Sequence, residues 1–345
     1  MRQPPLSQTP SYARRVTVWD AALSVVRAHL RGEGLREVST PVRVVAPAIE
    51  PYIDPIAAPP GFLATSPELA MKRLLARGSG PIFQVSHVFR RAERGDRHSE
   101  EFHLLEWYRL GGELRALEAD VEAIVARVYV AVGREPPARW LRADFFALFE
   151  QHCGVTLRGD EDDAELHALL DPQLRAGVWG GQGSDDSRSG PLASRDPEVR
   201  RLAAWTSLFS VWSDLHLDPW LVDQGEVGVH LGNFPAALAA LAQRSEQGGR
   251  AVAHRLESHV AGVELANGYL ELRDPAEQRR RFLAVDALRG ALGQASLPLD
   301  EDFLRELGEP GLPLCTGMAL GLDRLIMLAC GCTRLDDISL ALGAA

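Results

Sequence analysis

The stretch RHSEEFHLLEWYR, residues 97–109, has the pattern of a β-strand that carries one unsuitable side chain. Alternate residues share a face of a strand, so Glu106 lies on the face that also carries Leu104 and Tyr108. A carboxylate on an apolar face needs a cation or several hydrogen-bond donors to offset its desolvation. We therefore expect Glu106 to bind a positively charged group.

Two further glutamates, Glu257 and Glu264, lie on predicted strands at residues 255–260 and 262–272. If the chain reverses near residues 260–261, the two carboxylates face each other, and like charges directly opposite destabilise a sheet. A divalent cation between them would remove this repulsion, and oxygen ligands suit Mg²⁺. The alternative is a pair of solvent-exposed glutamates on the edge of a hairpin.

The segment FRRAERGDRHSEEF, residues 89–102, gathers basic side chains in a turn between two predicted strands. Arginine binds phosphate through two parallel hydrogen bonds, which makes Arg90 a candidate phosphate ligand. Phe102, at the end of the turn, offers a flat face for an adenine ring. The alternative is a charged turn that is simply solvated.

The segment TGMALGLDRL, residues 316–325, reads as a strand that continues into a helix. Gly317 and Gly321 would allow a ligand to approach the backbone closely. Arg324 falls in the first helical turn, where free N–H groups attract anions and a basic side chain is unfavourable. A bound phosphate would account for Arg324, and an ion pair with Asp323 or another acid is the alternative.

Composition limits the class of protein. The chain has 345 residues, of which 46% are hydrophobic, enough for a sizeable core in one or two domains. The net charge of −10 argues against nonspecific binding to nucleic acid or to an anionic membrane. The four cysteines form no CxxC pair, which favours reduced thiols over a disulfide framework or a zinc site. We expect neither a signal peptide nor a membrane span.

Periodicity and turn residues indicate the positions of the elements. Helices are expected at residues 14–31, 66–78, 113–132, 201–215 and 275–290. Strands are expected at residues 35–39, 62–65, 82–90, 255–260 and 262–272, and within 97–109 after a polar turn at 91–101, with a strand-to-helix segment at 314–331. Ser66 is the candidate N-cap of its helix. Residues 1–11 read as a flexible N-terminus and residues 178–199, rich in Gly, Ser and Asp, as a mobile loop. The fold class is α/β (α+β), with a largely antiparallel sheet flanked by helices.

Together these segments resemble the signature motifs of class II aminoacyl-tRNA synthetases. The first helix with LREVSTP resembles motif 1, FR…RHSEEF resembles motif 2, and GMALGLDRL resembles motif 3. SPELAMKRLL and VELANGYLEL are similar to the lysyl branch. The resemblance implies a single catalytic domain over residues 12–345, with a helical insertion at about 112–215. It also implies a homodimer, because motif 1 forms the dimer interface in that family.

Two features resemble a paralogous branch. Lysyl-tRNA synthetases carry an N-terminal anticodon-binding barrel, and here the motifs begin too close to Met1 to leave room for one. Trp107 in LLEWY, and Ala319 where lysyl-tRNA synthetases usually have glycine, resemble the paralogue that attaches lysine, preferably (R)-β-lysine, to elongation factor P. The methyl group of Ala319 would favour the shifted amino group of β-lysine. This resemblance implies a cytoplasmic, ATP- and Mg²⁺-dependent ligase that forms an aminoacyl adenylate and transfers the acyl group to a lysine ε-amine.

The resemblance also assigns residues. The amino acid pocket would comprise Ser66, Pro67, Glu68, Glu106, Tyr108, Asn267, Glu271 and Ala319. The ATP site would comprise Arg90, Glu93, His98, Ser99, Phe102, Glu257, Ser258, Glu264, Gly321 and Arg324. Arg90 and Arg324 would be the catalytic residues, and Glu257 and Glu264 would hold Mg²⁺. Ala92 stands where the family usually has an acid that contacts adenine, so that contact shifts to Glu93 or to the backbone.

Two other functions remain open from the sequence. The first keeps the chemistry but transfers the amino acid to tRNA or another carrier, against which the net charge of −10 and the expected lack of an anticodon domain both count. The second is a synthetase-derived sensor without turnover. The charged candidates of motifs 2 and 3 are all retained, which counts against such a sensor.

Overall fold

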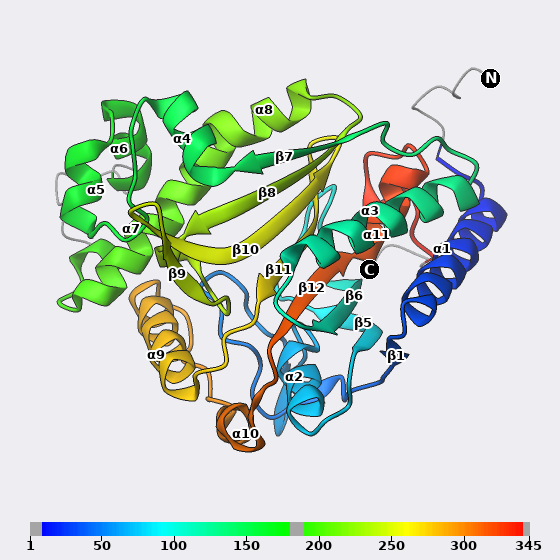
Figure 1. Ribbon diagram of the computed structural model, residues 1–345, viewed down its shortest axis with the longest axis horizontal. Coiled ribbons are helices and arrows are strands. Elements are labelled where there is room, and N and C mark those ends of the chain that lie inside the picture. Colours follow the sequence, from blue (N-terminus) through cyan, green and yellow to red (C-terminus); the bar gives the residue numbers. More distant parts are fainter. Residues whose placement is uncertain (1–8, 180–189, 341–345) are drawn as a thin grey trace.

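A mixed β-sheet forms the centre of the computed structural model, which describes residues 9–179 and 190–340 (Figure 1). Its strands, in spatial order, are β1 (Arg36–Glu37), β5 (Ile82–Phe89), β6 (Glu101–Leu110), β12 (Cys315–Gly321), β11 (Val263–Leu270), β10 (Arg250–Val260), β8 (Gly228–Pro235) and β7 (Trp140–Asp144), and β9 (Arg244–Gln247) pairs with β10. The pairs β1–β5 and β7–β8 are parallel, and the other neighbours are antiparallel. The predicted fold class is thereby confirmed.

The expected helices form, with their ends shifted by a few residues. They are α1 (Tyr12–Gly32), α2 (Glu68–Ala76), α3 (Leu114–Ala131), α7 (Pro197–Trp212), α9 (Pro275–Ala291) and α11 (Leu322–Ala329). Apolar residues of α1, α3 and α11 pack with β6, β10, β11 and β12 in one continuous core. Leu105 and Trp107 of β6 belong to this core, so Glu106 and Tyr108 point to the opposite face of the sheet.

Several elements escaped the sequence patterns. They are α4 (Phe145–Cys153), α5 (Asp163–Leu169), α6 (Pro172–Trp179), α8 (Asp218–Asp223), α10 (Glu301–Glu306), the strands β2 (Arg43–Val44), β3 (Ala57–Ala58), β7, β8 and β9, and short helical turns at Pro191–Ala193, Ser213–Leu217, Ala236–Leu238, Leu307–Gly311 and Leu335–Asp337. The strand predicted at residues 62–65 is β4 (Gly61–Leu63), which pairs with β2 and β3 in a small separate sheet. Figure 1 shows α4 to α8 grouped at the end of the sheet that ends in β7. They enclose a second core rich in Phe and Trp.

The span from 112 to 215 contains one strand besides its helices, because β7 lies between α3 and α4 and joins the main sheet. Of the predicted loop 178–199, residues 180–189 lie outside the described residues. Helix α6 ends at Trp179 and α7 begins at Pro197, so both edges of this segment are helical. Residues 1–8 of the predicted flexible N-terminus also lie outside the described residues.

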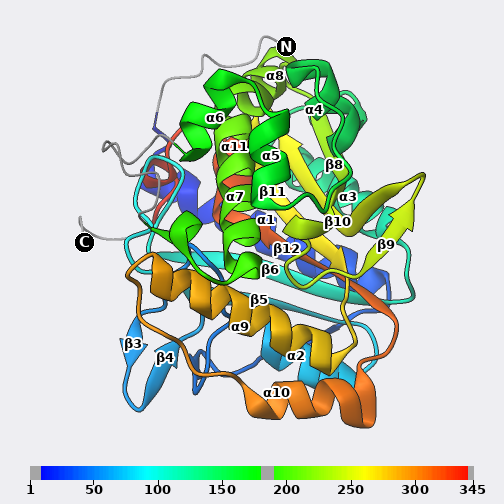
Figure 2. The same cartoon turned by 90° about the vertical axis from the view of Figure 1, so that its left-hand side faces the viewer.

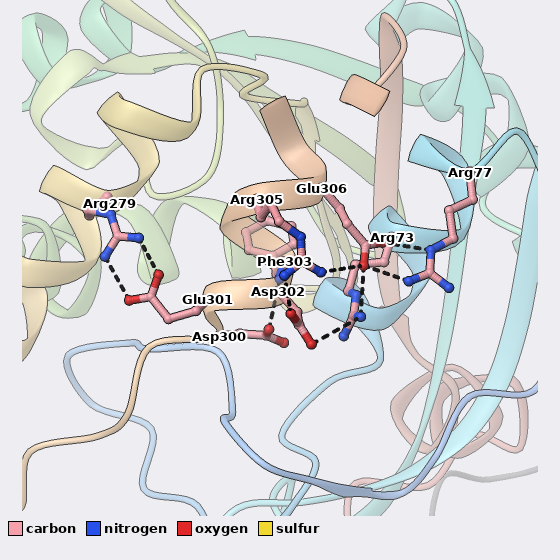
Figure 3. A network of polar contacts seen from close by, with 9 residues as sticks. All are labelled: Arg73, Arg77, Arg279, Asp300, Glu301, Asp302, Phe303, Arg305 and Glu306. Atoms are coloured by element: carbon pink, nitrogen blue, oxygen red, sulfur yellow. Dashed lines mark hydrogen bonds and ion pairs between the residues drawn. The ribbon is translucent and has the colours of Figure 1, made fainter. Parts of the chain in front are cut away.

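A network of ion pairs holds α10 against α2 and α9 (Figure 3). The buried Glu306 carboxylate accepts hydrogen bonds from Arg73 at 2.9 Å and from Arg77 at 2.6 and 2.8 Å. Arg279 of α9 forms a two-pronged ion pair with Glu301 at the start of α10. This network fixes α2, the helix that begins with Glu68, and so supports one wall of the candidate site described below.

The Glu306 network predicts a pH-dependent contribution to stability. Its hydrogen bonds with Arg77 lower the pKa of Glu306 from 4.5 to about 2, in spite of burial. A carboxyl whose pKa is lowered by folding stabilises the fold above its unfolded pKa and loses that effect as the pH falls through the folded value. We expect Glu306→Gln to lower the free energy of unfolding by about 1–3 kcal/mol at pH 7, because the partner arginines are partly exposed.

Urea unfolding of the variant and the natural chain from pH 7 downwards measures this difference, which should shrink below pH 4.5. Glu309→Gln is the control, since Glu309 is exposed and has no ion pair in the described part of the chain. A Glu306→Gln difference that stays constant with pH would contradict the assignment.

Candidate active site

A cavity of about 350 Å³ lies over β6, β11 and β12 and brings distant segments together. Most residues predicted for the site line it: Ser66, Glu68, Arg90, Glu93, His98, Ser99, Phe102, Glu106, Tyr108, Glu264, Asn267, Glu271, Ala319, Gly321 and Arg324. Ala319 sits between the two halves of the sheet, opposite Glu106 on one neighbouring strand and opposite Asn267 on the other.

Glu106 lies at the inner end of the cavity with one oxygen unsatisfied. The Tyr108 hydroxyl donates to its Oε1 at 2.5 Å, and its buried Oε2 has no hydrogen-bond partner in the described residues. Burial raises the pKa of the Glu106 carboxyl well above its usual range, and the nearby charge of Glu68 adds to this effect. An ammonium group bound at this end would satisfy Oε2 and stabilise the ionised carboxylate.

A buried lysine lies between two more carboxylates at the same end. Lys72 Nζ is 2.6 Å from Glu68 Oε1 and 2.5 Å from Glu271 Oε2, and its side chain is 1% exposed. Burial by itself would lower the pKa of Lys72, but Glu271 and Glu68 raise it. With Glu106, this end therefore holds three carboxylates around one buried cation, so a ligand with two ammonium groups would complete the charge balance when all three carboxylates are ionised.

Sequence reasoning missed Lys72. A lysine in an amphipathic helix is normally exposed, so the residue type gave no indication that Lys72 would be buried. The available signal was its position four residues after Glu68, which places both side chains on one face of α2.

The outer end of the cavity is basic. Arg324 donates to the Arg97 carbonyl at 3.1 Å, to the Glu264 carbonyl at 3.0 Å and to His98 Nε2 at 2.7 Å. Burial, with a smaller effect of Arg324, lowers the pKa of His98, so a neutral imidazole is available to accept from the guanidinium. Arg324 thus joins the motif 2 turn to β11 at the mouth of the cavity.

Of the alternative partners of Arg324, Asp323 was wrong, whereas another acid, Glu264, lies within ion-pair distance, 3.7 Å from the guanidinium. Asp323 accepts a hydrogen bond from the His103 backbone N–H at 2.6 Å and lies 3.4 Å from the His103 ring nitrogen Nδ1. The Asp323 carboxylate is therefore engaged with His103 of β6, and the Arg324 side chain extends across the mouth of the cavity.

Arg90 and Phe102 lie together beside this basic end. The Arg90 guanidinium lies over the Phe102 ring, 5.1 Å from its centroid, and Nε is 3.4 Å from the Thr65 carbonyl oxygen. Ala92 has a left-handed conformation with φ of 62°, and Glu93, the next residue, lines the cavity. The adenine contact was expected from Glu93 or from the backbone, and the structure brings the Glu93 side chain to the cavity.

A β-bulge determines how Glu257 and Glu264 are placed. The predicted chain reversal is confirmed, since Ala261 and Gly262 form a two-residue turn with φ of 50° and 73°. The predicted direct opposition was wrong, because Glu257 pairs with Asn267 and Glu264 pairs with His259.

This register leaves Leu265 unpaired, since Ser258 pairs with Ala266 and His259 pairs with Glu264. An extra residue in one strand reverses the alternation of faces beyond it. Glu264 therefore falls on the same face as Asn267 and Glu257, although the plain spacing along β11 would put it on the other.

Three predicted residues do not line the cavity. Glu257 shares the face of Glu264 and Asn267 but is not part of the cavity wall, and it pairs with Arg255 at 2.5 Å. The buried Ser258 hydroxyl is 2.9 Å from His230 Nδ1, on the other face of β10. Pro67 occupies the N-cap position of α2 and borders a separate groove.

The predicted cap of α2 was also wrong. Because Pro67 stands at the N-cap position, Ser66 lies one residue earlier and makes no cap hydrogen bond. Its buried hydroxyl has no partner among the described residues and belongs to the cavity wall. The hydroxyl is therefore available to a ligand.

Tyr269 is a further wall residue that the sequence could have given. It lies on β11 midway between Asn267 and Glu271, the residue that follows the strand, and Asn267 Nδ2 donates to its hydroxyl at 3.2 Å. Because Asn267 and Glu271 were both predicted to face the site, the alternation of side chains along a strand would have placed Tyr269 on the same face.

The carboxylate pair fits a divalent cation that also binds phosphate. Burial, together with the charge of Glu264, raises the pKa of Glu257, and a cation between the two would lower it. No group of three or more His, Cys, Asp or Glu side chains converges on a metal position within residues 9–179 and 190–340. Mg²⁺ commonly takes one or two protein carboxylates and completes its shell with phosphate oxygens and water, so two glutamates suffice.

The two glycines of motif 3 differ in what they require. A Cβ on Gly317 would lie 2.3 Å from Glu271 Oε1 and 2.4 Å from Tyr108 Cε1, so any side chain there displaces the inner wall. A Cβ on Gly321 would meet only the Arg324 side chain, at 3.7 Å or more, which is ordinary contact. The packing of the chain explains Gly317, whereas Gly321 is left for a ligand.

We expect Gly317→Ala to lower the free energy of unfolding by about 1–3 kcal/mol, because the added methyl group overpacks the buried wall. Gly232→Ala in β8 is the matched control, since a Cβ there has no neighbour within 4 Å. Urea unfolding of both variants checks this, and equal stability of the two would show that the inner wall tolerates displacement.

No helix in the described ranges combines the length and the apolar composition that a membrane span requires. Residues 6–340 match the family described as tRNA synthetases class II (D, K and N).

Curated relatives agree with this match. The chain is 35% identical to the elongation factor P--(R)-beta-lysine ligase of Haemophilus influenzae (strain PittGG), over 92% of this chain and 91% of that protein. It is 32% identical to the enzyme of the same name from Pectobacterium atrosepticum, over 96% of this chain and 98% of that protein. The corresponding protein of Edwardsiella ictaluri is 35% identical over 92% and 91%.

Proposed function

This chain belongs to the class II tRNA synthetases of the D, K and N group, and we propose that it joins (R)-β-lysine to elongation factor P at the expense of ATP. The observation that carries this proposal is the opposite charge at the two ends of one cavity. Carboxylates around Lys72 form the inner end, and Arg90 and Arg324 mark the outer end. Such a site suits a substrate with ammonium groups on one side and phosphates on the other.

The inner end would bind the amino acid. Glu106 and Glu271 would bind the side-chain ammonium, with the Tyr108 hydroxyl holding Glu106 in place. Ser66 and Glu68 would take the other amino group, and the unpaired Ser66 hydroxyl supports this. Desolvated carboxylates discriminate strongly against a substrate that leaves them unpaired.

The outer end would bind ATP. Phe102 would stack on adenine, and Glu93 would contact its amino group. Arg90 would hold the α-phosphate and the carboxylate of the amino acid, the latter together with Asn267. His98, Ser99 and Arg324 would reach the outer phosphates beside Gly321, whose lack of a side chain leaves room there.

Mg²⁺ would be held by Glu257 and Glu264 with the phosphates, and would supply charge neutralisation. Arg90 and Arg324 would orient the triphosphate and stabilise its developing negative charge. The carboxylate oxygen of the amino acid attacks the α-phosphorus, and pyrophosphate leaves. An ε-amine of the acceptor then attacks the acyl carbon of the adenylate, and AMP leaves.

We also expect a homodimer and a cytoplasmic reaction. Helix α1, which corresponds to motif 1, leaves Tyr12 and Val16 about half exposed, and a second copy would cover them. ATP and a translation factor meet in the cytoplasm, which supports the proposed compartment. Light scattering of the purified chain measures the oligomeric state directly.

Ala319 would set the preference for β-lysine. Its position between Glu106 and Asn267 places a methyl group between the proposed ammonium and carboxylate sites. We expect Ala319→Gly to reduce the ratio of β-lysine to α-lysine activation by about tenfold or more, which is the usual effect of one methyl group in a pocket. ATP–pyrophosphate exchange with each amino acid measures the ratio, and an unchanged ratio would remove Ala319 from selectivity.

The acceptor is tested by the intact mass of purified elongation factor P after incubation with the chain, ATP, Mg²⁺ and (R)-β-lysine. We expect a mass increase of one lysyl group, and none when ATP is omitted. Pyrophosphate exchange without any change in the mass of elongation factor P would move the acceptor to tRNA or another carrier. Absence of exchange would favour a sensor without turnover.

A further inference from the structure

A second cavity, of about 920 Å³, adjoins the first. The two cavities share Glu50, His98, Glu264, Asn267 and Tyr269, so they meet along the open side of the proposed adenylate site. The second cavity extends between α7 and α9, which Figure 2 shows next to each other. It therefore offers an approach to the reacting groups that does not pass through the amino acid end.

The walls of the second cavity suit a long alkyl chain. Apolar side chains from α7, α9 and the turn after β8 line it: Leu202, Leu238, Leu241, Phe282 and Val285. A lysine side chain has such an alkyl stem and carries its charge at the tip. The shared rim supplies the polar groups that the tip would meet.

Glu50 stands on that rim with a fixed backbone and a free carboxylate. Arg289, whose side chain is 1% exposed, donates to the Glu50 carbonyl at 3.0 Å and to the Ile53 carbonyl at 2.9 Å. The Glu50 side chain lines both cavities and makes no hydrogen bond or ion pair with the described residues. Its position is therefore set by α9, while its oxygens remain available.

Charged groups from both ends of the first cavity act on Glu50, which itself lines that cavity. Burial raises the pKa of Glu50, Glu68 and Glu93 act in the same direction, and Arg90 and Arg255 oppose them. Glu50 lines the first cavity together with Glu68 of the proposed amino acid end and Glu93 of the proposed adenine end. Arg90, which is proposed to hold both the substrate carboxylate and the α-phosphate, has the largest lowering effect on the pKa of Glu50.

We propose that the second cavity admits the lysine side chain of the acceptor protein and that Glu50 accepts the proton of its ε-ammonium. The inference rests on the proposed function, which requires an amine to attack the adenylate. A lysine ammonium has a pKa of about 10.4, so it must lose a proton before it can attack near neutral pH. Among the described residues, Glu50 combines exposure to both cavities with a carboxylate that has no other partner.

The step balances as follows in atoms and charge. The ε-ammonium gives one proton to the Glu50 carboxylate, and the nitrogen lone pair forms a bond to the acyl carbon of the adenylate. The bond from that carbon to the phosphate oxygen breaks, and AMP leaves with the electron pair. The nitrogen loses its second proton to the departing phosphate, which gives the neutral amide, and Glu50 returns its proton to water.

Glu50→Gln tests this role by separating the two half-reactions. We expect ATP–pyrophosphate exchange with (R)-β-lysine to be unchanged, because adenylate formation needs no base. Single-turnover transfer from the adenylate to elongation factor P should fall by about 100-fold or more, the usual effect of removing a general base. Asp214→Asn is the matched control, since it removes one carboxylate from the second cavity, away from the shared rim, and transfer should be unchanged.

Hydroxylamine distinguishes proton removal from a structural effect, because it is already neutral at pH 7. Formation of the lysyl hydroxamate by Glu50→Gln should equal that of the natural chain, whereas transfer to the lysine acceptor is lost. Equal loss of both reactions, or transfer to elongation factor P at the natural rate, would overturn the inference. If the natural chain itself shows no exchange, the proposed function has failed instead, and the two failures are thereby distinguished.

Discussion

The buried contact of Lys72 with Glu68 and Glu271 is the interaction on which the site depends. Three carboxylates at the inner end of the cavity would repel each other strongly if they were ionised without a cation in this desolvated space. Lys72 neutralises part of this charge and leaves the remainder, centred on Glu106, for a ligand. The inner end is therefore stable enough to fold and still lacks positive charge, which is the condition for selective binding of ammonium groups.

The rest of the fold holds this charge arrangement in place. Strands β6 and β11 present Glu106 and Glu264 on the face of the cavity, while apolar side chains of the other face pack on α1, α3 and α11. Gly317 leaves the space that Glu271 and Tyr108 occupy, and the Glu306 network anchors α2 from the opposite side. At the outer end Arg324 ties the motif 2 turn to β11, which sets the distance between the basic and acidic ends.

Local patterns were sufficient for the elements that carry the motifs, because the alternation of β6 and the helical period of α1 and α3 are strong signals. The same patterns misplaced Glu264 relative to Glu257, since a single bulge at Leu265 reverses the faces of a strand and leaves no mark in the composition. Glu50 and Lys72 were missed for a different reason. Glu50 is placed by a tertiary contact with Arg289 of α9, and Lys72 by a contact with Glu271 just after β11. The spacing of Lys72 from Glu68 puts both on one face of α2, but it does not reveal the contact with Glu271.

The most direct test of the central claim is ATP–pyrophosphate exchange with lysine compared with norleucine, which has the same carbon skeleton but lacks the ε-amine. If the inner end selects an ammonium group, lysine and β-lysine support exchange, while norleucine leaves Glu106 and its neighbours without a cation and supports none. Exchange with norleucine at a rate similar to that with lysine would contradict the account, because the carboxylates around Lys72 would then have no part in recognising the substrate.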